Sequence, residues 1–294
     1  MKIRIGVSLG AAAVPDGFAA ALDQLEAAGV DSLWLSEMVF GPLIEPFAGM
    51  AYALARTRKL KVGTGVAVLP GRHPVLVAKE LTTLAGLAPG RVLPVFGLRP
   101  ARRAEATAFP VPPGRRAAVF DESLALLRQL VTGQPVSFAG EFFTVEAASV
   151  GPAPAKPLDI WLGGSAPAAL RRVGAYGDGW LGSFMSPAEA GQAREAIQAA
   201  ASEAGREIEA DHYGISLAVG QDGLPPELLR AIEDRRPGAD PASLAAGSWA
   251  AARELITGFI EAGLTKFVVR PAGPGLAVSR FIEEFCQELL PLQN

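Results

Sequence analysis

Few residues in this chain have side chains that could carry out acid–base or nucleophilic chemistry. It contains two histidines, His73 and His212, and one cysteine, Cys286. One cysteine excludes an internal disulfide, and so few histidines and cysteines lead us to predict no metal site. Glu37, at the end of a predicted strand, and His73, in a loop that enters a predicted helix, are the candidate catalytic residues. A salt bridge for Glu37 and a capping role for His73 are the competing structural interpretations.

Two glycine motifs carry a sharper signal. A predicted strand at 158–162 runs into Gly163, Gly164, Ser165 and Ala166, and a helix follows. Converging N–H groups, a hydroxyl and a helix N-terminus would bind phosphate, although an ordinary turn with an N-capping serine has the same pattern. The second motif, Gly63-Thr64-Gly65-Val66, interrupts another predicted strand. Glycine there marks either the close approach of a ligand or a packing position inside the fold.

Short apolar runs alternate with amphipathic helical patterns along the whole chain. Strands are predicted at 3–8, 32–36, 60–69, 91–96, 158–162, 179–182, 213–219 and 266–270. Helices are predicted at 15–28, 46–56, 74–87, 115–131, 166–175, 187–204, 250–262 and 277–290, with a hairpin at 134–145. This alternation predicts a single (β/α)8 TIM-like barrel over residues 1–294, with an insertion at 221–248; a doubly wound sheet is the alternative. In such a barrel the site lies at the carboxyl ends of the strands, where Ser8, Glu37, Gly97 and Gly163 fall.

Composition narrows the functional classes further. With 27 basic and 30 acidic residues, the net charge of −3 argues against a nucleic-acid-binding protein. The sequence has no uninterrupted stretch of about 18 apolar residues, so we predict no membrane-spanning helix. The apolar run 5–14 is broken by Gly6, Ser8 and Gly10, which favours a strand over a signal peptide. We therefore expect a soluble cytoplasmic protein that acts on a small molecule.

Three segments resemble the bacterial luciferase-like flavin and deazaflavin oxidoreductases. They are LKVGTGVAVLPGRHPVLVAKELTTLAGL at 60–87, FDESLALLRQLVTGQPVSFAGEFF at 120–143 and LDIWLGGSAPAALRRVGAYGDGW at 158–180. Matching segments recur in order over most of the chain, and they are most similar to the probable F420-dependent branch. The resemblance implies a TIM-like barrel with F420, or alternatively FMN, in its mouth, and it suggests a homodimer. It also implies a non-prolyl cis peptide at Gly65–Val66, behind the cofactor ring.

The resemblance also implies which residues bind the cofactor. They are Thr64, Gly65, Val66, Gly97, Gly163, Gly164, Ser165 and Ala166. Ser8, from its place at the end of the first strand, and Arg99, from a basic loop with Arg102 and Arg103, complete the predicted set. The chain departs from some deazaflavin enzymes, because Met38 stands in place of an acid histidine and Arg99-Pro100 in place of a glycine-glutamate pair. The sugar-phosphate dehydrogenase mechanism of those enzymes is therefore not carried over.

Together these features predict an oxidoreductase that transfers a hydride between F420 and an unidentified small organic substrate. A cofactor that carries the difficult chemistry accounts for the scarcity of acid–base groups. An FMN-dependent monooxygenase is the first alternative. A non-catalytic cofactor-binding barrel and a lyase or isomerase acting on a phosphorylated substrate are the others.

Overall fold

The strands form a closed ring. The computed structural model describes residues 2–273 and 277–294. Its parallel strand segments are β1 (Arg4–Val7), β2 (Ser32–Leu35), β3 (Lys61–Thr64), β4 (Ala67–Val68), β5 (Val92–Leu93), β6 (Val95–Gly97), β9 (Trp161–Gly163), β10 (Gly179–Ser183), β11 (Tyr213–Val219) and β12 (Lys266–Pro271). Only Gly65 and Val66 separate β3 from β4, and only Pro94 separates β5 from β6. Since β3 pairs with β5, β4 with β6 and β12 with β1, the ten segments close into a barrel of eight strands. The predicted (β/α)8 barrel is confirmed.

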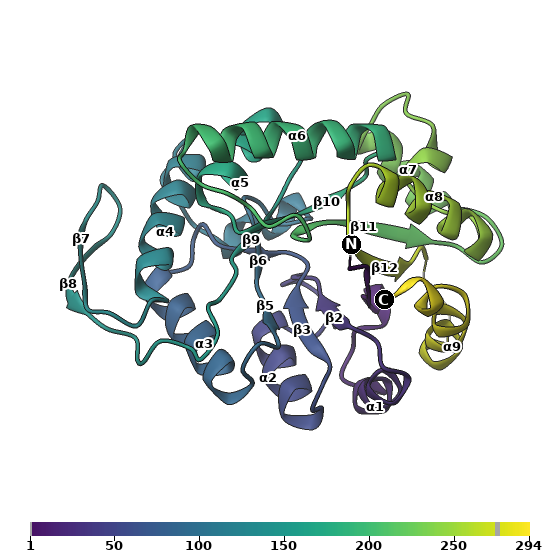
Figure 1. Ribbon diagram of the computed structural model, residues 1–294, viewed down its shortest axis with the longest axis horizontal. Coiled ribbons are helices and arrows are strands. Elements are labelled where there is room, and N and C mark those ends of the chain that lie inside the picture. The colour runs from purple at the N-terminus through teal and green to yellow at the C-terminus, as the bar shows by residue number, and fades with distance from the viewer. Residues whose placement is uncertain (1, 274–276) are drawn as a thin grey trace.

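Helices surround this ring (Figure 1). They are α1 (Phe18–Ala28), α2 (Pro46–Arg56), α3 (Pro74–Leu87), α4 (Arg116–Leu130), α5 (Pro167–Tyr176), α6 (Pro187–Glu203), α7 (Pro226–Arg235), α8 (Trp249–Glu261) and α9 (Val278–Glu288). Proline starts several of them, because its fixed φ suits the first turn and its missing N–H has no partner there in any case. Outward-facing strand residues such as Ile5, Val7 and Phe267 pack with apolar helix residues in the main core.

The strand predicted at 158–162 begins three residues later, at Trp161. The Ile160 N–H donates to the Asp178 carboxylate at 2.9 Å. Because the Ile160 N–H bonds a side chain, the backbone hydrogen bonds between β9 and its neighbouring strands start one residue later, at Trp161.

A buried ionic cluster holds the amino end of the barrel. The Asp31 carboxylate bonds the ammonium groups of Lys61 at 2.9 Å and Lys266 at 3.0 Å. Burial alone would raise the pKa of Asp31, but the two ammonium groups outweigh it and hold this pKa well below its usual range. The cluster ties the starts of β2, β3 and β12 together, opposite the end where a TIM barrel carries its site.

Two segments leave the barrel outline. The antiparallel hairpin of β7 (Val136–Ala139) and β8 (Thr144–Ala148) projects at the left of Figure 1. Within residues 221–248, α7 and the following turn build a small apolar cluster with Ala218 of β11, made of Leu228, Ile232, Leu244 and Ala245. This cluster places α7 over the carboxyl end of β11.

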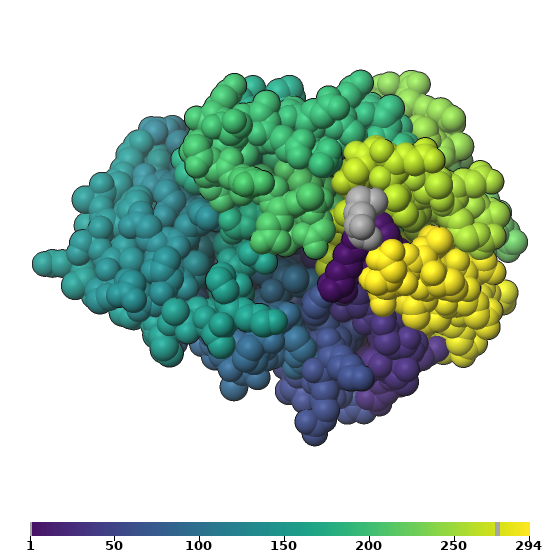
Figure 2. Space-filling view, viewed as in Figure 1, coloured from purple at the N-terminus to yellow at the C-terminus, as the bar shows by residue number. Residues whose placement is uncertain are grey.

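The two ends of the chain meet. Ile3 N–H donates to Asn294 Oδ1 at 2.8 Å, and Ile5 N–H donates to Gln293 Oε1 at 3.2 Å. Figure 2 shows the purple N-terminal residues beside the yellow C-terminal segment. Across the two described ranges, no helix combines the length and apolar character needed to cross a bilayer.

Candidate active site at the mouth of the barrel

The inside of the barrel is filled by a plug of apolar side chains. Side chains alternate between the two faces of a strand, so every second residue points inward. The inward residues at mid-height form one buried cluster: Trp34, Val95, Trp161, Leu181 and Val268, with Val66 and Leu93 packed against it. These side chains fill the barrel at mid-height, so a ligand must lie above them, toward the carboxyl ends of the strands.

Above the plug, the inward positions at the carboxyl ends of the strands form what we call the floor layer. Its members are Ser8, Ser36, Val66, Gly97, Gly163, Ser183, Ala218 and Arg270. Most of them are small; Ser183 is exposed, and Ser36 and Gly163 are partly exposed. Small side chains at this height project little into the mouth of the barrel, so a flat ring would fit over them better than over large side chains.

Val66 is held tightly in this layer. A Cβ added at Gly97 would lie 2.6 Å from Val66 Cγ2, and one added at Gly163 would lie 3.0 Å from Val66 Cγ1. The Gly65–Val66 peptide bond is cis, as the resemblance implies. Ser36 Oγ donates to the Gly65 carbonyl at 3.1 Å. Glycine at positions 97 and 163 thus makes room for the valine side chain.

Thr64 positions this segment from the buried side. Its hydroxyl donates to the Val95 carbonyl at 2.7 Å and accepts from the Val95 N–H at 2.8 Å. Both bonds join β3 to the neighbouring strand, and the side chain is fully buried. Thr64 therefore anchors the backbone on which Gly65 and Val66 are presented.

The second glycine motif opens the first turn of α5. The N-cap residue is Ala166, and no side chain caps the helix, so Ser165 is not the N-capping serine of the simpler interpretation. Within residues 2–273 and 277–294, the backbone N–H groups of Ser165, Ala166 and Ala168 have no acceptor. Free N–H groups at a helix N-terminus fit an anion such as a phosphate.

Trp180 fixes the shape of this loop. Its indole Nε1–H donates to the Gly164 carbonyl at 2.8 Å. Gly164 has a φ of +114°, a conformation that residues with a Cβ rarely adopt. The Asp-Gly-Trp segment noted in the sequence therefore acts through structure: Asp178 bonds the start of β9, and Trp180 orients the loop at its end.

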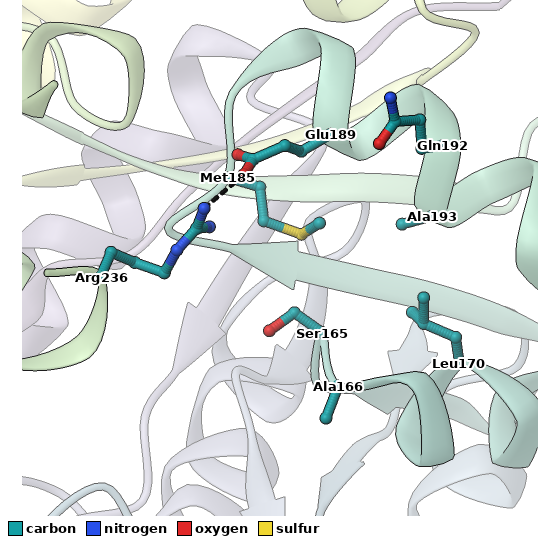
Figure 3. A pocket seen from close by; sticks show the side chains of 8 residues that line it. All are labelled: Ser165, Ala166, Leu170, Met185, Glu189, Gln192, Ala193 and Arg236. Carbon is teal, nitrogen blue, oxygen red and sulfur yellow. Dashed lines mark hydrogen bonds and ion pairs between the residues drawn. The ribbon is translucent and has the colours of Figure 1, made fainter. Parts of the chain in front are cut away.

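A pocket of about 410 Å³ lies beside this loop. Its lining residues are Ser165, Ala166, Leu170, Met185, Glu189, Gln192, Ala193 and Arg236. Figure 3 shows Ser165 and Met185 directed into the space, and Arg236 joined to Glu189 across one side. The Arg236 guanidinium, with the Ser186 N–H, holds the pKa of Glu189 below its usual range. The pocket extends the phosphate loop toward an arginine that residues 221–248 supply.

Glu37 lies next to the floor layer but points away from it. One carboxylate oxygen accepts from the Val68 N–H at 2.7 Å, and the other bonds the Arg72 guanidinium. Burial raises the pKa of Glu37, against the lowering effect of the Val68 N–H and Arg72. Arg72 also stacks on Phe47 and Phe109. Both oxygens of Glu37 are thus used to join the end of β2 to β4.

His73 is exposed and forms the N-cap of α3. Its Nδ1 accepts from the Val75 N–H at 3.3 Å, and its ring packs edge-on against Phe143. The structure therefore does not bring His73 to the floor layer, and its predicted catalytic role is still a prediction.

The loop after β6 is basic, as the sequence shows. Arg99, Arg102 and Arg103 are exposed, and Arg102 donates to the Phe40 carbonyl at 3.1 Å. This bond joins the loop to the one that follows β2. Arg172, by contrast, is bonded to Asp121 and stacked on Phe120, so it ties α5 to α4 and is not free to meet an anion.

Sequence reasoning missed several residues of this region. Glu105 is fully buried in the loop after β6. One of its oxygens accepts from the Phe40 N–H at 3.2 Å, and the other has no partner among the residues that the structure describes. Ser36 and Ser183 are expected at strand ends near the site but are assigned no role by the sequence, and strand alternation places both in the floor layer. Arg270 follows Val268 on the inward face, a position that the period of two would have revealed. The only potential metal-binding group among the described residues, Glu209, Asp211 and His212, lies at the opposite end of β11.

Comparison with known proteins agrees with this architecture. An uncharacterized protein of Mycobacterium tuberculosis is 34% identical over 194 residues, which is 66% of this chain and 65% of that protein. An F420-dependent glucose-6-phosphate dehydrogenase of Kineococcus radiotolerans is 26% identical over 92% of this chain and 90% of its own length.

Solved structures show the same fold. An F420-dependent secondary alcohol dehydrogenase in complex with an F420–acetone adduct superposes with a TM-score of 0.81 at 20% identity, with both chains fully covered. An FMN complex of the oxygenating constituent of 3,6-diketocamphane monooxygenase from Pseudomonas putida gives 0.74 at 18% identity, with 100% of this chain and 99% of that chain covered. The sequence model of the luciferase-like monooxygenase family matches residues 1–222, and the chain belongs to this family.

Proposed function

We propose that the protein is an oxidoreductase that transfers a hydride between F420 and a small organic substrate. The observation that carries the proposal is the open floor layer of small residues beside an uncapped helix N-terminus. A flat ring and a phosphate match these two features. The names of the dehydrogenases from Kineococcus radiotolerans and Beutenbergia cavernae, 26% identical over nine-tenths of the chain, favour F420.

In this proposal the chain binds and orients. Bound F420 supplies the hydride chemistry at its C5 carbon. The proposed cofactor-binding residues are Ser8, Thr64, Gly65, Val66, Gly97, Arg99, Gly163, Gly164, Ser165 and Ala166. Thr64 is fully buried and would act through the backbone of Gly65 and Val66 that it anchors. Gly97 and Gly163 leave room beside Val66, and the plug below keeps water from that side. Fixing the two reactants at the right separation supplies much of the rate enhancement, so few acid–base side chains are required.

Glu37 and His73 are the candidate catalytic residues that the sequence predicts, and their contacts suggest how each would act. Both oxygens of Glu37 are bonded, and His73 caps a helix. We therefore propose that they act as positioning residues, Glu37 on the β2 and β4 ends and His73 on the start of α3.

An FMN-dependent monooxygenase is the second candidate. It is favoured by the family description and by the fold shared with an FMN-containing monooxygenase. FMN also carries a flat ring and a phosphate, so the same floor layer and loop would serve it.

Titration of the purified protein with F420 and with FMN separates the candidates. We expect F420 to bind at least about tenfold more tightly, and a panel of alcohols to bleach its absorbance band. A tightly bound yellow flavin that O₂ reoxidises would support the monooxygenase. Tight binding of either cofactor without turnover of any substrate would support a non-catalytic barrel.

Three further expectations belong to the proposal. We propose one domain over residues 1–294 with an insertion at 221–248, a cytoplasmic location, and a homodimer. We place the proposed interface at α3, which carries the exposed apolar side chains of Leu76 near its start and Leu87 at its end. Analytical ultracentrifugation tests this expectation.

A further inference from the structure

Arg270 is the charged member of the floor layer. In β12 the inward residues are Lys266, Val268 and Arg270, because alternate side chains share a face. Val268 belongs to the plug, so Arg270 lies at the next inward position toward the mouth. The register pairs Arg270 with Ala218, and Ser8 follows the Val7–Val269 pair on the other side. The guanidinium thus stands between two strands whose floor residues are small.

This guanidinium has no anionic partner. Over residues 2–273 and 277–294, no hydrogen bond or ion pair involves the Arg270 side chain, although it is partly buried and packs on Phe184. Burial, and then the like charge of Arg235, lower the pKa of Arg270 to about 10, so it is still a cation at neutral pH. A guanidinium offers five N–H donors, so Arg270 presents donors at the mouth that an anion can accept from.

A phenylalanine holds the two arginines near each other. The guanidinium carbon of Arg270 lies 5.7 Å from the centroid of the Phe184 ring, and that of Arg235 lies 5.0 Å from it. Phe184 follows β10 with a φ of +54°, which is rare for a bulky residue and typical of functional sites. Arg236 donates to the Phe184 carbonyl at 2.7 Å and stabilises this conformation.

Within the described residues, a carboxylate balances the charge of Arg236 but not the charges of Arg235 and Arg270. Glu189 pairs with Arg236. Within the described ranges, Arg235 donates only to the Ala231 carbonyl, at 3.3 Å, and neither it nor Arg270 pairs with a carboxylate. Two cations therefore face a common place at the mouth, between β10, β12 and the end of α7.

We propose that Arg270 and Arg235 bind an oxyanion group of the substrate, a carboxylate or a phosphate, so that the substrate is a small anionic molecule. Assigning this anion to the substrate rests on the proposed function, and the order of the strands around the barrel supports it. The phosphate loop follows β9, and β10 and β11 separate β9 from β12. An anion at Arg270 would thus be distinct from one at Ser165.

The test measures binding of inorganic phosphate and of acetate by calorimetry, to the full-length protein with and without saturating F420. We expect Arg270→Gln to weaken binding of at least one anion about tenfold or more, and Arg235→Gln to weaken it several-fold. Arg230→Gln is the matched control, because Arg230 is an exposed arginine of the same helix α7. It should bind both anions like the parent protein.

The outcomes separate this site from the cofactor. Anion binding that persists with saturating F420, together with unchanged F420 affinity in Arg270→Gln, supports a substrate site. Competition between F420 and phosphate, with F420 affinity lost in Arg270→Gln, assigns the arginine to the cofactor and overturns the proposal. Unchanged binding of both anions in Arg270→Gln also overturns it.

Two provisions keep the test decisive. If Arg270→Gln does not fold, Arg235→Gln and Arg270→Lys carry the comparison, since Arg235 is exposed and lysine keeps the charge without the planar fork. If F420 does not bind at all, the proposed function fails, yet the anion titrations of the free protein still decide whether Arg270 forms an anion site.

Discussion

Replacing Gly97 by alanine should disturb the floor layer through a single methyl group. The added Cβ would lie 2.6 Å from Val66 Cγ2, which is closer than non-bonded carbons approach. Gly97 does not have a positive φ, so alanine meets no backbone penalty there. On the other side the backbone of Gly163 lies close to Val66, since a Cβ added at Gly163 would lie 3.0 Å from Val66 Cγ1. Val66 therefore has little room to retreat along the floor and must move toward the mouth.

The expected cost follows from these contacts. Overpacking of this kind costs about 1–3 kcal/mol. Alanine also reduces the entropy of the unfolded chain relative to glycine, which offsets about 0.4–1 kcal/mol. We therefore expect Gly97→Ala to lower the free energy of unfolding by about 1–2 kcal/mol. Because the displaced valine enters the space proposed for the ring, F420 affinity should fall about tenfold.

A double-mutant cycle isolates the contact. Val66→Ala removes both methyl groups that the new Cβ would meet, so the double variant Gly97→Ala/Val66→Ala should recover about 1–2 kcal/mol relative to the sum of the single variants. Urea denaturation measures stability, and absorbance titration measures F420 affinity. Gly86→Ala on α3 is the matched control, because no atom lies within 4 Å of its added Cβ. It should gain about 0.5–1 kcal/mol.

Two results would refute this reasoning. If Gly97→Ala were as stable as Gly86→Ala, the close approach of Val66 would not constrain the layer. If the single effects simply added in the double variant, the cost would arise from another contact.

Three more predictions concern contacts that support the barrel or the site. Glu37→Gln should lower the unfolding free energy by about 1–3 kcal/mol in thermal or urea denaturation, because Arg72 loses its charged partner; lost turnover at unchanged stability would instead support a catalytic role. Asp31 has a lowered pKa in the folded protein, so its contribution to the free energy of unfolding is complete above about pH 5. That contribution is lost progressively as the pH falls below about 4. In Asp31→Asn, the free energy of unfolding measured in urea should depend less on pH below about pH 5 than it does in the parent protein. An unchanged pH dependence in that acid range would contradict the assignment. Trp180→Phe removes the donor to the Gly164 carbonyl and should weaken F420 or phosphate binding several-fold in titrations; unchanged affinity would mean that the loop keeps its shape without the indole.

Much of the fold follows from local pattern. The bounds of α2 and α3 match the predicted ranges, because proline marks each start and the apolar spacing is clear. The start of β9 differs because the Asp178 carboxylate, distant in sequence, takes the Ile160 N–H. The interrupted strand and the Gly163–Ala166 loop are visible in the sequence because glycine is required where backbone and side chains approach closely.

The sequence by itself determined the barrel, the family and the two glycine motifs, since periodicity, turn residues and short motifs are local properties. Only the tertiary structure decided which way the polar side chains point. It turned Glu37 toward Arg72, placed His73 at a helix cap, and brought Arg270 beside Phe184 and Arg235. The cap at His73 is a local contact, and the sequence offered it as one of two interpretations. The contacts of Glu37 with Arg72 and of Arg270 with Phe184 join residues from separate βα units, so they depend on how the ring closes.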